Sequence, residues 1–520
     1  MITNLNELIA VKALIDKVDP WVSECLKGYT PKQIFSNKIV KDPVWGMTIL
    51  TPLEVSILDS PLLQRLRRIY QTGLVNLTYP AALHTRFEHS IGMLHCATSI
   101  IDSINRNEKS QKKNPRFTEK DEQEIRLACL LHDVGHSTLS HLTEDLYSGY
   151  TEIEQAKQSL EASEPSVKPK NHELLSAVIV MTPSFLSIFE KAVEKNRNNL
   201  IDFANISANR IADMIIGRPV EGKLEQAFIT DIINGSYDAD RLDYIFRDSY
   251  FTGLALGTDV EKFISGLSIE KVESTGKTSI VLAFNSMSSY DRLISSKVSL
   301  SSDVYNHQKV LATNVLVKNI LYILNTDLNN TIQGISLKNP IDFLSLTDWS
   351  FLTGTTKSTD IRNLQEMIAR RDIPVRYVKI FHQSINSNNE EGEIPPSIAP
   401  YFSGGDKERN DLIRLLCKNC GFDFFKPKSI FMEFPEFPSL GELQNAYIKN
   451  YDGTSVLYNS IMPTNQYNND FGYKWAVYVF GHYEKLEKDI YEKVISCLQH
   501  ILNIELNDNA RPRKLWIKRT

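Results

Sequence analysis

The stretch LLHDVGHSTLSH, residues 130–141, brings three histidines and one aspartate close together. The whole chain of 520 residues has only 11 histidines, so this density is unusual. The apolar helical pattern before it, EIRLACLL, places His132 and Asp133 near the C-terminal end of a helix. An imidazole beside a carboxylate suits a divalent metal ion. Because one turn supplies too few ligands, a metal site would need side chains from other segments.

Two other segments could complete such a site. HTRFEHSIG, residues 84–92, offers two histidines, an arginine and a glutamate, and DADRLDYIFRD, residues 238–248, offers four aspartates on one expected helix. Both also have an ordinary structural explanation. A single helical histidine is more often a core or surface residue, and an aspartate-rich helix is usually a solvated face. The spacing alone leaves these explanations open.

Composition and charge narrow the class of protein. The chain is 42% hydrophobic and 23% charged, as in ordinary globular proteins. A formal net charge of -5 argues against a protein that wraps itself in nucleic acid. Only the basic C-terminal stretch ARPRKLWIKRT gives weak support for contact with nucleic acid. We find neither an apolar run of about 18 residues nor the apolar core of a signal peptide. The scattered cysteines form no disulfide pattern, so we expect a cytoplasmic protein without a membrane segment.

Local patterns predict a helical body. KIVKDPVWGMTIL, residues 38–50, predicts a short hairpin, and the next helix is expected to start at the N-cap Ser60 and to end at Gly73. Further helical periodicity covers residues 87–105, 121–133, 172–181, 208–216, 224–234, 239–248 and 287–326.

The region beyond residue 345 has a different pattern. Strand-like runs are few before TSIVLAFN (278–285), but RYVKIF, SIFMEF, TSVLYNS and YKWAVYVFG follow residue 345 and precede the helical HYEKLEKDIYEKVISCLQHIL. We therefore predict a mainly α fold. It would comprise an N-terminal helical extension (1–36), a helical body (37–345) and a smaller C-terminal α+β region (346–520).

The combination of a single histidine, a His-Asp pair and a later aspartate resembles the signature of the HD-domain metal-dependent phosphohydrolases. The wider likeness is to their deoxynucleoside triphosphate triphosphohydrolase branch, the dNTPases and dGTPases, and covers about residues 37 to 310 in matching order and spacing. The segments that carry it are DPVWG, SPLLQRLRRIYQTG, HTRFEHSIGMLHCA, LLHDVGHSTLSHLTED, NHELLS, DADRLDYIFRDSYFTG and VYNH. The resemblance implies an HD-domain helical bundle and does not extend beyond about residue 345.

Carried over to this chain, the family pattern assigns the metal to four residues. They are His89, His132, Asp133 and Asp240. Two imidazoles and two carboxylates offset much of a divalent charge and leave positions for water and a phosphate oxygen. The resemblance implies a divalent transition metal (Mn, Fe, Zn or Ni), and Mg could accompany the nucleotide phosphates.

The resemblance also implies a catalytic group around the phosphates. His136 and His172 are expected to contact phosphate oxygens. His141, oriented by Glu144, is the expected general acid for the leaving oxygen, because imidazole titrates near neutral pH.

Seven residues match substrate-binding positions of the family. They are Gln71, Arg86, Arg241, Tyr244, Asp248, Tyr305 and His307. The two arginines would clamp phosphate oxygens. Asp248 would bind the 3′-hydroxyl, and Tyr244 would lie against C2′ and leave no room for a 2′-hydroxyl. Ordinary alternatives stay open, since Gln71 and Tyr244 could be packing residues and Asp248 could only pair with an arginine.

Asp59, Gln64 and Arg67 match positions that bind an activating guanine nucleotide between subunits in some family members. If this match holds, the protein has a nucleotide activator and forms a homo-oligomer, a dimer or tetramer. The alternative is a helix-capping Asp59 and a surface Arg67.

One part of the chain departs from the family pattern. Family members commonly carry basic residues just before the equivalents of Tyr305 and His307, where this chain has Ser302 and Asp303. We expect hydrolysis of deoxynucleoside triphosphates to deoxynucleoside and triphosphate. Two alternatives stay open: hydrolysis of a nucleoside monophosphate, cyclic nucleotide or nucleic acid, and a nucleotide-sensing partner protein. Whether the activity balances nucleotide pools or serves antiviral defence is also open.

Overall fold

The computed structural model describes residues 4–110, 112–196, 206–386, 394–403, 406–435, 445–462, 475–485 and 488–511. The chain divides into two compact units. The first comprises Met1–Leu300, Lys338–Trp349 and Leu440–Ile461, and the second comprises Ser301–Leu337, Ser350–Ser439 and Met462–Thr520. The units interleave along the sequence, and the expected division at residues 36 and 345 stays a prediction. Most of the basic C-terminal stretch, residues 512–520, lies outside the described residues.

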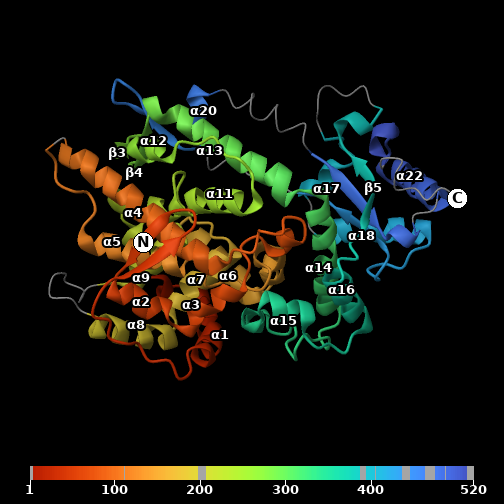
Figure 1. Ribbon diagram of the computed structural model, residues 1–520, viewed down its shortest axis with the longest axis horizontal. Helices are drawn as coiled ribbons and strands as arrows, with labels where there is room; N and C mark the ends of the chain where they lie inside the picture. Colours follow the sequence, from red (N-terminus) through yellow and green to blue (C-terminus); the bar gives the residue numbers. More distant parts are fainter. Residues whose placement is uncertain are drawn as a thin grey trace. The chain divides into compact units, whose positions relative to one another are not determined.

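The first unit is mostly helical, as predicted (Figure 1). Its helices are α1 (Ile9–Cys25), α2 (Pro52–Leu58), α3 (Pro61–Gln64), α4 (Arg86–Ser110), α5 (Glu119–Leu131), α6 (Thr151–Ser163), α7 (Asn171–Met181), α8 (Pro183–Lys195), α9 (Ala208–Ile215), α10 (Ala227–Asn234), α11 (Ala239–Thr252), α12 (Val260–Ser265), α13 (Met287–Ser299) and α20 (Tyr458–Ile461). Its strands are β1 (Lys38–Asp42), β2 (Gly46–Leu50), β3 (Leu267–Val272), β4 (Lys277–Ala283), β7 (Tyr447–Lys449) and β8 (Ser455–Leu457).

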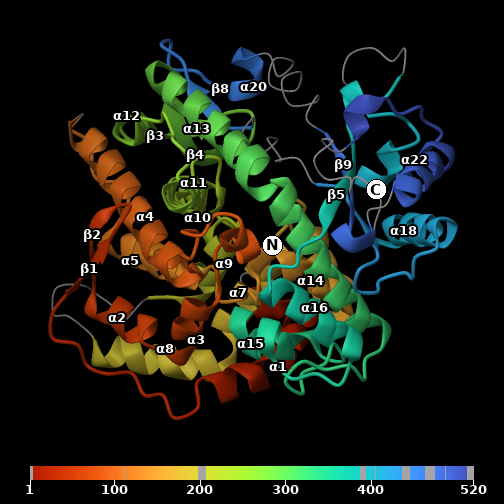
Figure 2. The same ribbon diagram turned by 45° about the vertical axis from the view of Figure 1, so that its right-hand side comes forward.

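Helix α4, at the centre of this unit, packs on both α5 and α11 (Figures 1 and 2). Thr118 and Asp121 form a capping box at the start of α5. Asp238 caps α11 by accepting the backbone N–H of Arg241, and Gly253 ends this helix in the left-handed conformation at φ +75°. Local capping signals therefore fix where these helices begin and end.

The helix predicted over residues 60–73 is much shorter than expected. Ser60 and Pro61 start α3 as predicted, but helical backbone ends by Arg68. The next residues pair with the segment before α4: Tyr70 bridges Thr85, and the N–H of Gln71 donates to the carbonyl of His84 at 3.0 Å. This pairing satisfies the backbone groups that the last helical turns would have used.

The pattern predicted as one helix over residues 287–326 is interrupted. Helix α13 passes into a π-helical turn, Leu300–Tyr305, and a new helix, α14 (Gln308–Thr326), begins after His307. The side chain of His307 accepts the backbone N–H of Lys309 at 3.3 Å and so caps α14. A side chain that caps a new helix explains the break in an otherwise continuous helical pattern.

The second unit contains the predicted mixed α and β elements. Its helices are α14, α16 (Thr359–Ala369), α17 (Ala399–Ser403), α18 (Asp406–Cys420) and α22 (Lys488–Leu502), and its strands are β5 (Val375–Ile380), β6 (Ile430–Glu433) and β9 (Val477–Gly481). Helix α15 (Asp348–Thr353) runs from the first unit into the second. The strands form an antiparallel sheet in the order β5-β9-β6, whose apolar side chains build a separate core with α18 and α22.

One predicted C-terminal strand belongs to the other unit. TSVLYNS contains β8, which joins the sheet β3-β4-β7-β8, where β7 pairs in parallel with β4. Residues 445–461 therefore return to the first unit instead of extending the C-terminal sheet. The order of strands along the sequence does not reveal such a long-range pairing.

Among the described residues, no single helix has the length and apolar composition to cross a membrane. In the described part of the chain, the bent pair α7 and α8 together has such a length and composition.

A glycine of α4 allows α11 to approach closely. A Cβ added at Gly92 would lie 2.0 Å from Asp243 Oδ1 and 2.1 Å from Arg247 Nη2, two fully buried groups that cannot move aside. We predict that Gly92→Ala lowers the free energy of unfolding by about 2–3 kcal/mol, the usual cost of an overpacked core. Urea denaturation measures this change.

The matched control is Gly257→Ala, because a Cβ at the exposed Gly257 meets nothing within 4 Å. This variant should stay within about 0.5 kcal/mol of the parent protein. Equal stability of the two variants would show that α4 and α11 do not need the glycine.

Candidate metal centre and histidine cluster

The central helices bring together four side chains from three separate segments. His89 lies on α4, His132 and Asp133 directly follow α5, and Asp240 lies in the first turn of α11. His89 Nε2 is 3.0 Å from Asp240 Oδ1 and 3.9 Å from Asp133 Oδ2, and His132 Nε2 is 3.2 Å from Asp133 Oδ1. Asp240 keeps 34% of its side chain exposed, so the group opens to solvent on that side.

Hydrogen bonds on the far side of each ring fix the imidazole tautomers. His132 Nδ1 donates to the carbonyl of Cys129 at 2.7 Å, and His89 Nδ1 donates to Asp243 Oδ2 at 2.7 Å. The Nε2 atoms of both rings therefore face the aspartates. The Nε2 atom of His132 is buried and has no hydrogen-bond partner among the described residues.

The electrostatics of the group favour a positive charge on His89 and the ionised form of Asp133. Burial disfavours the charged form of His89, but Asp240 and Asp243 outweigh it and raise the pKa to about 10. Burial also disfavours the Asp133 carboxylate, yet Arg86 and the nearby histidines hold its pKa well below the usual range. Ligand atoms of His89, His132 and Asp133 lie within 4.8 Å of one another. Two imidazoles and two carboxylates fit a divalent cation, and His89, His132 and Asp133 could hold one.

A buried ionic network holds the Nδ1 side of His89, and the sequence alone did not assign a supporting role to its residues. Asp243 accepts from Trp45 Nε1 at 2.5 Å and from Arg247 Nε at 2.8 Å, and Arg247 Nη2 lies 2.9 Å from Asp42 Oδ2. The DPVWG hairpin thus reaches the centre through Asp42 and Trp45. The sequence could have indicated this role for Asp243, because it lies one helical turn after Asp240 and so on the same face of the helix.

A second cluster gathers the other histidines of the family pattern. Glu144 accepts from His141 Nδ1 at 2.9 Å and from His172 Nδ1 at 2.8 Å, while the rings of His136 and His172 stack with centroids 3.9 Å apart. Burial opposes the Glu144 carboxylate, but His172 and His141 outweigh it and keep its pKa far below the usual range. Asp133 Oδ1 lies 3.4 Å from His136 Nε2 and so joins this cluster to the first group.

Gly135, between the two groups, has a packing role. A Cβ there would lie 2.4 Å from the carbonyl oxygen of His172 and 2.6 Å from the N of Ser176. The residue is therefore small because α7 packs directly against it.

Two of the predicted substrate residues have well-defined partners. Arg86 donates to Asp133 Oδ2 at 2.7 Å and to Ser140 Oγ at 2.9 Å, and its buried Nη2 has no hydrogen-bond partner among the described residues. Asp248 pairs with the buried His84 at 2.8 Å, a partner that the sequence did not indicate. Arg86 is therefore already paired with Asp133, one of the candidate metal ligands.

The other five predicted substrate residues lie on several separate segments of the chain. Arg241 donates to the carbonyl of Gly235 at 2.8 Å, and Tyr244 is half-buried one turn after Asp240. The Oε1 atom of Gln71 is buried without a hydrogen-bond partner among the described residues. Tyr305 and His307 belong to the second unit, and their roles toward a substrate stay predictions.

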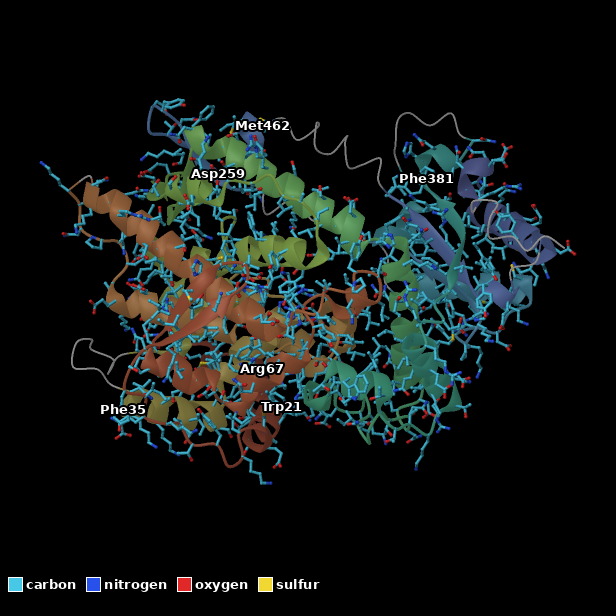
Figure 3. All side chains as sticks on the ribbon, in the orientation of Figure 1. Trp21, Phe35, Arg67, Asp259, Phe381 and Met462 are labelled. Carbon is cyan, nitrogen blue, oxygen red and sulfur yellow. The ribbon has the colours of Figure 1, made fainter. Side chains whose placement is uncertain are left out.

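The three residues of the predicted activator site lie on one short segment of the surface. Arg67, labelled in Figure 3, is exposed, donates to Gln64 Oε1 at 2.8 Å and covers the Phe87 ring at 3.6 Å. Asp59 is exposed at the C-terminal end of α2. Local packing accounts for these positions, and nucleotide binding there stays a prediction.

Comparison with known proteins gives a family and several relatives. A family model described as "HD domain" matches residues 86–204. An uncharacterised protein of Methanocaldococcus jannaschii is 31% identical over 282 residues, which are 54% of this chain and 48% of that protein. A protein of Dictyostelium discoideum named deoxynucleoside triphosphate triphosphohydrolase SAMHD1 homolog is 28% identical over 322 residues, 60% of this chain and 54% of its own.

The human protein named deoxynucleoside triphosphate triphosphohydrolase SAMHD1 is 28% identical over 260 residues, 46% of this chain and 37% of its own. The chain thus spans about half the length, or less, of these relatives. A crystal structure of a hypothetical protein from Aquifex aeolicus has a TM-score of 0.58 at 21% identity and covers 89% of this chain and 100% of its own. This structure shows that the fold is shared.

The hydrogen bond from His89 Nδ1 to Asp243 should strengthen metal binding. We predict that Asp243→Ala weakens Mn²⁺ binding by about 10- to 100-fold, because the imidazole loses the acceptor that fixes its tautomer and orientation. Asp243→Asn should lose less, since an amide oxygen can still accept from Nδ1. Isothermal titration calorimetry on metal-depleted protein measures the affinities.

Glu273→Gln serves as the control, because Glu273 is exposed on the turn after β3. It should bind Mn²⁺ as the parent protein does. A folded Asp243→Ala protein with unchanged affinity would contradict a supporting role for Asp243.

Proposed function

We propose, since this chain contains an HD domain, that it is a metal-dependent phosphohydrolase that cleaves deoxynucleoside triphosphates into deoxynucleoside and triphosphate. One observation carries the proposal: Asp133 Oδ1 lies 3.2 Å from His132 Nε2 and 3.4 Å from His136 Nε2. A set of metal-binding donors is thereby joined directly to a cluster suited to phosphate. The names of the Dictyostelium and human relatives, both deoxynucleoside triphosphate triphosphohydrolases, support the substrate class.

His89, His132, Asp133 and Asp240 would hold the cation. A divalent cation bound there supplies Lewis-acid polarisation of a phosphoryl oxygen and lowers the pKa of a coordinated water. Mn, Fe, Zn and Ni all accept such a mixed set of nitrogen and oxygen donors, and Mg could accompany the phosphates.

The residues around the cation would bind the phosphates and move one proton. Arg86 would clamp a phosphate oxygen with Nη2, while its other nitrogens stay bonded to Asp133 and Ser140. His136 and His172 would contact neighbouring oxygens. His141 would protonate the leaving oxygen, and its hydrogen bond to Glu144 holds the ring for this transfer.

Recognition of deoxyribose would involve α11. Asp248, held by the buried His84, would accept the 3′-hydroxyl, and Tyr244 would lie against C2′. A ring there excludes a 2′-hydroxyl by contact, so ribonucleotides should be poor substrates. Gln71, Arg241, Tyr305 and His307 complete the proposed binding set. Asp59, Gln64 and Arg67 would form an activator site in a homo-oligomer.

A second candidate is hydrolysis of a different phosphoester. Ser302 and Asp303 favour it, because they occupy positions where basic residues would compensate the outer phosphates. A nucleoside monophosphate or cyclic nucleotide carries less charge and needs less compensation.

Product analysis tests the proposal. The protein would be incubated with each of the four deoxynucleoside triphosphates, singly and mixed, in Mn²⁺ or Mg²⁺. We predict deoxynucleoside and triphosphate as products and a loss of at least about 100-fold in kcat for Asp133→Ala, which removes a ligand and the partner of Arg86.

Matched incubations with ribonucleoside triphosphates and with monophosphates serve as controls. Activity only in mixtures would indicate a nucleotide activator. Turnover of monophosphates alone would favour the second candidate, and a protein that binds metal but cleaves none of these compounds would overturn the proposal.

A further inference from the structure

The loop after α5 has an unfavourable backbone conformation. Leu139 and Ser140 adopt consecutive left-handed conformations, with φ of 57° and 55°. Each costs roughly 1 kcal/mol or more for a residue with a side chain, so other contacts must hold them. The residue that follows is His141, and its side chain contacts Glu144.

Asp348 holds this loop where the two strained residues, Leu139 and Ser140, begin. Its buried carboxylate accepts the backbone N–H of Leu139 at 2.6 Å, the hydroxyl of Thr138 at 3.2 Å and, through the other oxygen, the backbone N–H of Tyr70 at 2.7 Å. Burial raises the pKa of Asp348 to about 6, which shows that the site disfavours a charge. Three donors to one buried carboxylate offset much of that cost.

Neighbouring residues of the same segment hold the rest of the loop. The carbonyl of Phe343 accepts from Ser137 Oγ at 3.1 Å. Arg65 Nη1 donates to the carbonyls of Leu344 at 3.2 Å and His136 at 2.8 Å. Lys338–Trp349 thus belongs to the first unit, although the residues on both sides of it belong to the second.

The contacts of Asp348 continue to the arginine of the proposed phosphate site. Ser140 Oγ donates to the carbonyl of Tyr70 at 2.6 Å and accepts from Arg86 Nε at 2.9 Å. Asp348 fixes both backbone segments, through the N–H groups of Leu139 and Tyr70. One carboxylate therefore sets the position of Ser140, and through it that of Arg86.

We propose that Asp348 is a positioning residue for the reaction. It holds residues 138–140 so that His141 stays against Glu144 and Arg86 stays against Ser140 and Asp133. This inference rests on the proposed function for the chemistry that His141 and Arg86 perform. Asp348 itself contacts none of the four proposed metal ligands through any described bond.

Two substitutions and a matched control test the inference. Asp348→Ala removes all three acceptor contacts. Asp348→Asn keeps one oxygen for Leu139 and Thr138 but opposes the N–H of Tyr70 with an amide. The control, Asp342→Asn, changes an exposed carboxylate of the same segment that accepts from Asn339 Nδ2 at 3.0 Å.

Hydrogen exchange is the first readout and needs no substrate. In Asp348→Ala, the amides of residues 69–72 and 134–142 should exchange at least about tenfold faster, while those of α5 stay unchanged. The second readout is steady-state kinetics at saturating Mn²⁺. We expect kcat to fall about 100-fold in Asp348→Ala and about tenfold in Asp348→Asn, with KM within about threefold, because misplacement acts mainly on the reacting geometry.

The outcomes separate positioning from general destabilisation. Metal stoichiometry equal to that of the parent protein, together with faster loop exchange and lower kcat, supports the inference. Unchanged loop exchange, or kcat within about twofold of the parent in both variants, overturns it. If Asp348→Ala does not fold, the same comparison in Asp348→Asn decides. If the parent protein cleaves no phosphoester, the proposed function fails, and the exchange result still decides whether Asp348 holds the loop.

Discussion

The buried carboxylate of Asp133 lies between two groups of imidazoles, and the arrangement of the first unit depends on it. Oδ1 faces both His132 Nε2 and His136 Nε2, at 3.2 Å and 3.4 Å, and Oδ2 pairs with Arg86 at 2.7 Å. A carboxylate with 1% exposure is unfavourable unless positive partners surround it. Helix α4, which supplies Arg86, and the turn after α5, which supplies the histidines, must therefore lie close together, and a cation there would satisfy the same requirement.

The imidazoles around this carboxylate are held by acceptors on their far sides. Asp243 fixes His89, the carbonyl of Cys129 fixes His132, and Glu144 fixes both His141 and His172. The Nε2 atoms of His89 and His132 thereby face Asp240 and Asp133. In both clusters a hydrogen-bond acceptor on the far side of the ring fixes the imidazole, although one cluster is suited to a cation and the other to phosphate oxygens.

Support for these groups comes from distant parts of the chain. The hairpin of β1 and β2 contributes Asp42 and Trp45, which contact the Arg247 and Asp243 pair that holds His89. The segment Lys338–Trp349 contributes Asp348, which holds the loop at residues 138–140. This segment spans residue 345, where the change from helical to strand-like patterns predicted a boundary. A boundary inferred from local patterns cannot detect such a return, because a few residues at the right place in space change little in the local pattern.

Sequence by itself determined the local features of this protein. Apolar periodicity located α4, α5, α7 and α11 to within about five residues, and the order of histidines and aspartates resembled that of the HD-domain phosphohydrolases. Only the tertiary structure decided the short helix after Ser60, the break at His307, the return of β8 to the first unit, and the roles of Asp243 and Asp348. Capping and periodicity act between neighbours in the chain, whereas a buried charge is stabilised by whatever donors the fold brings to it, from any distance along the sequence.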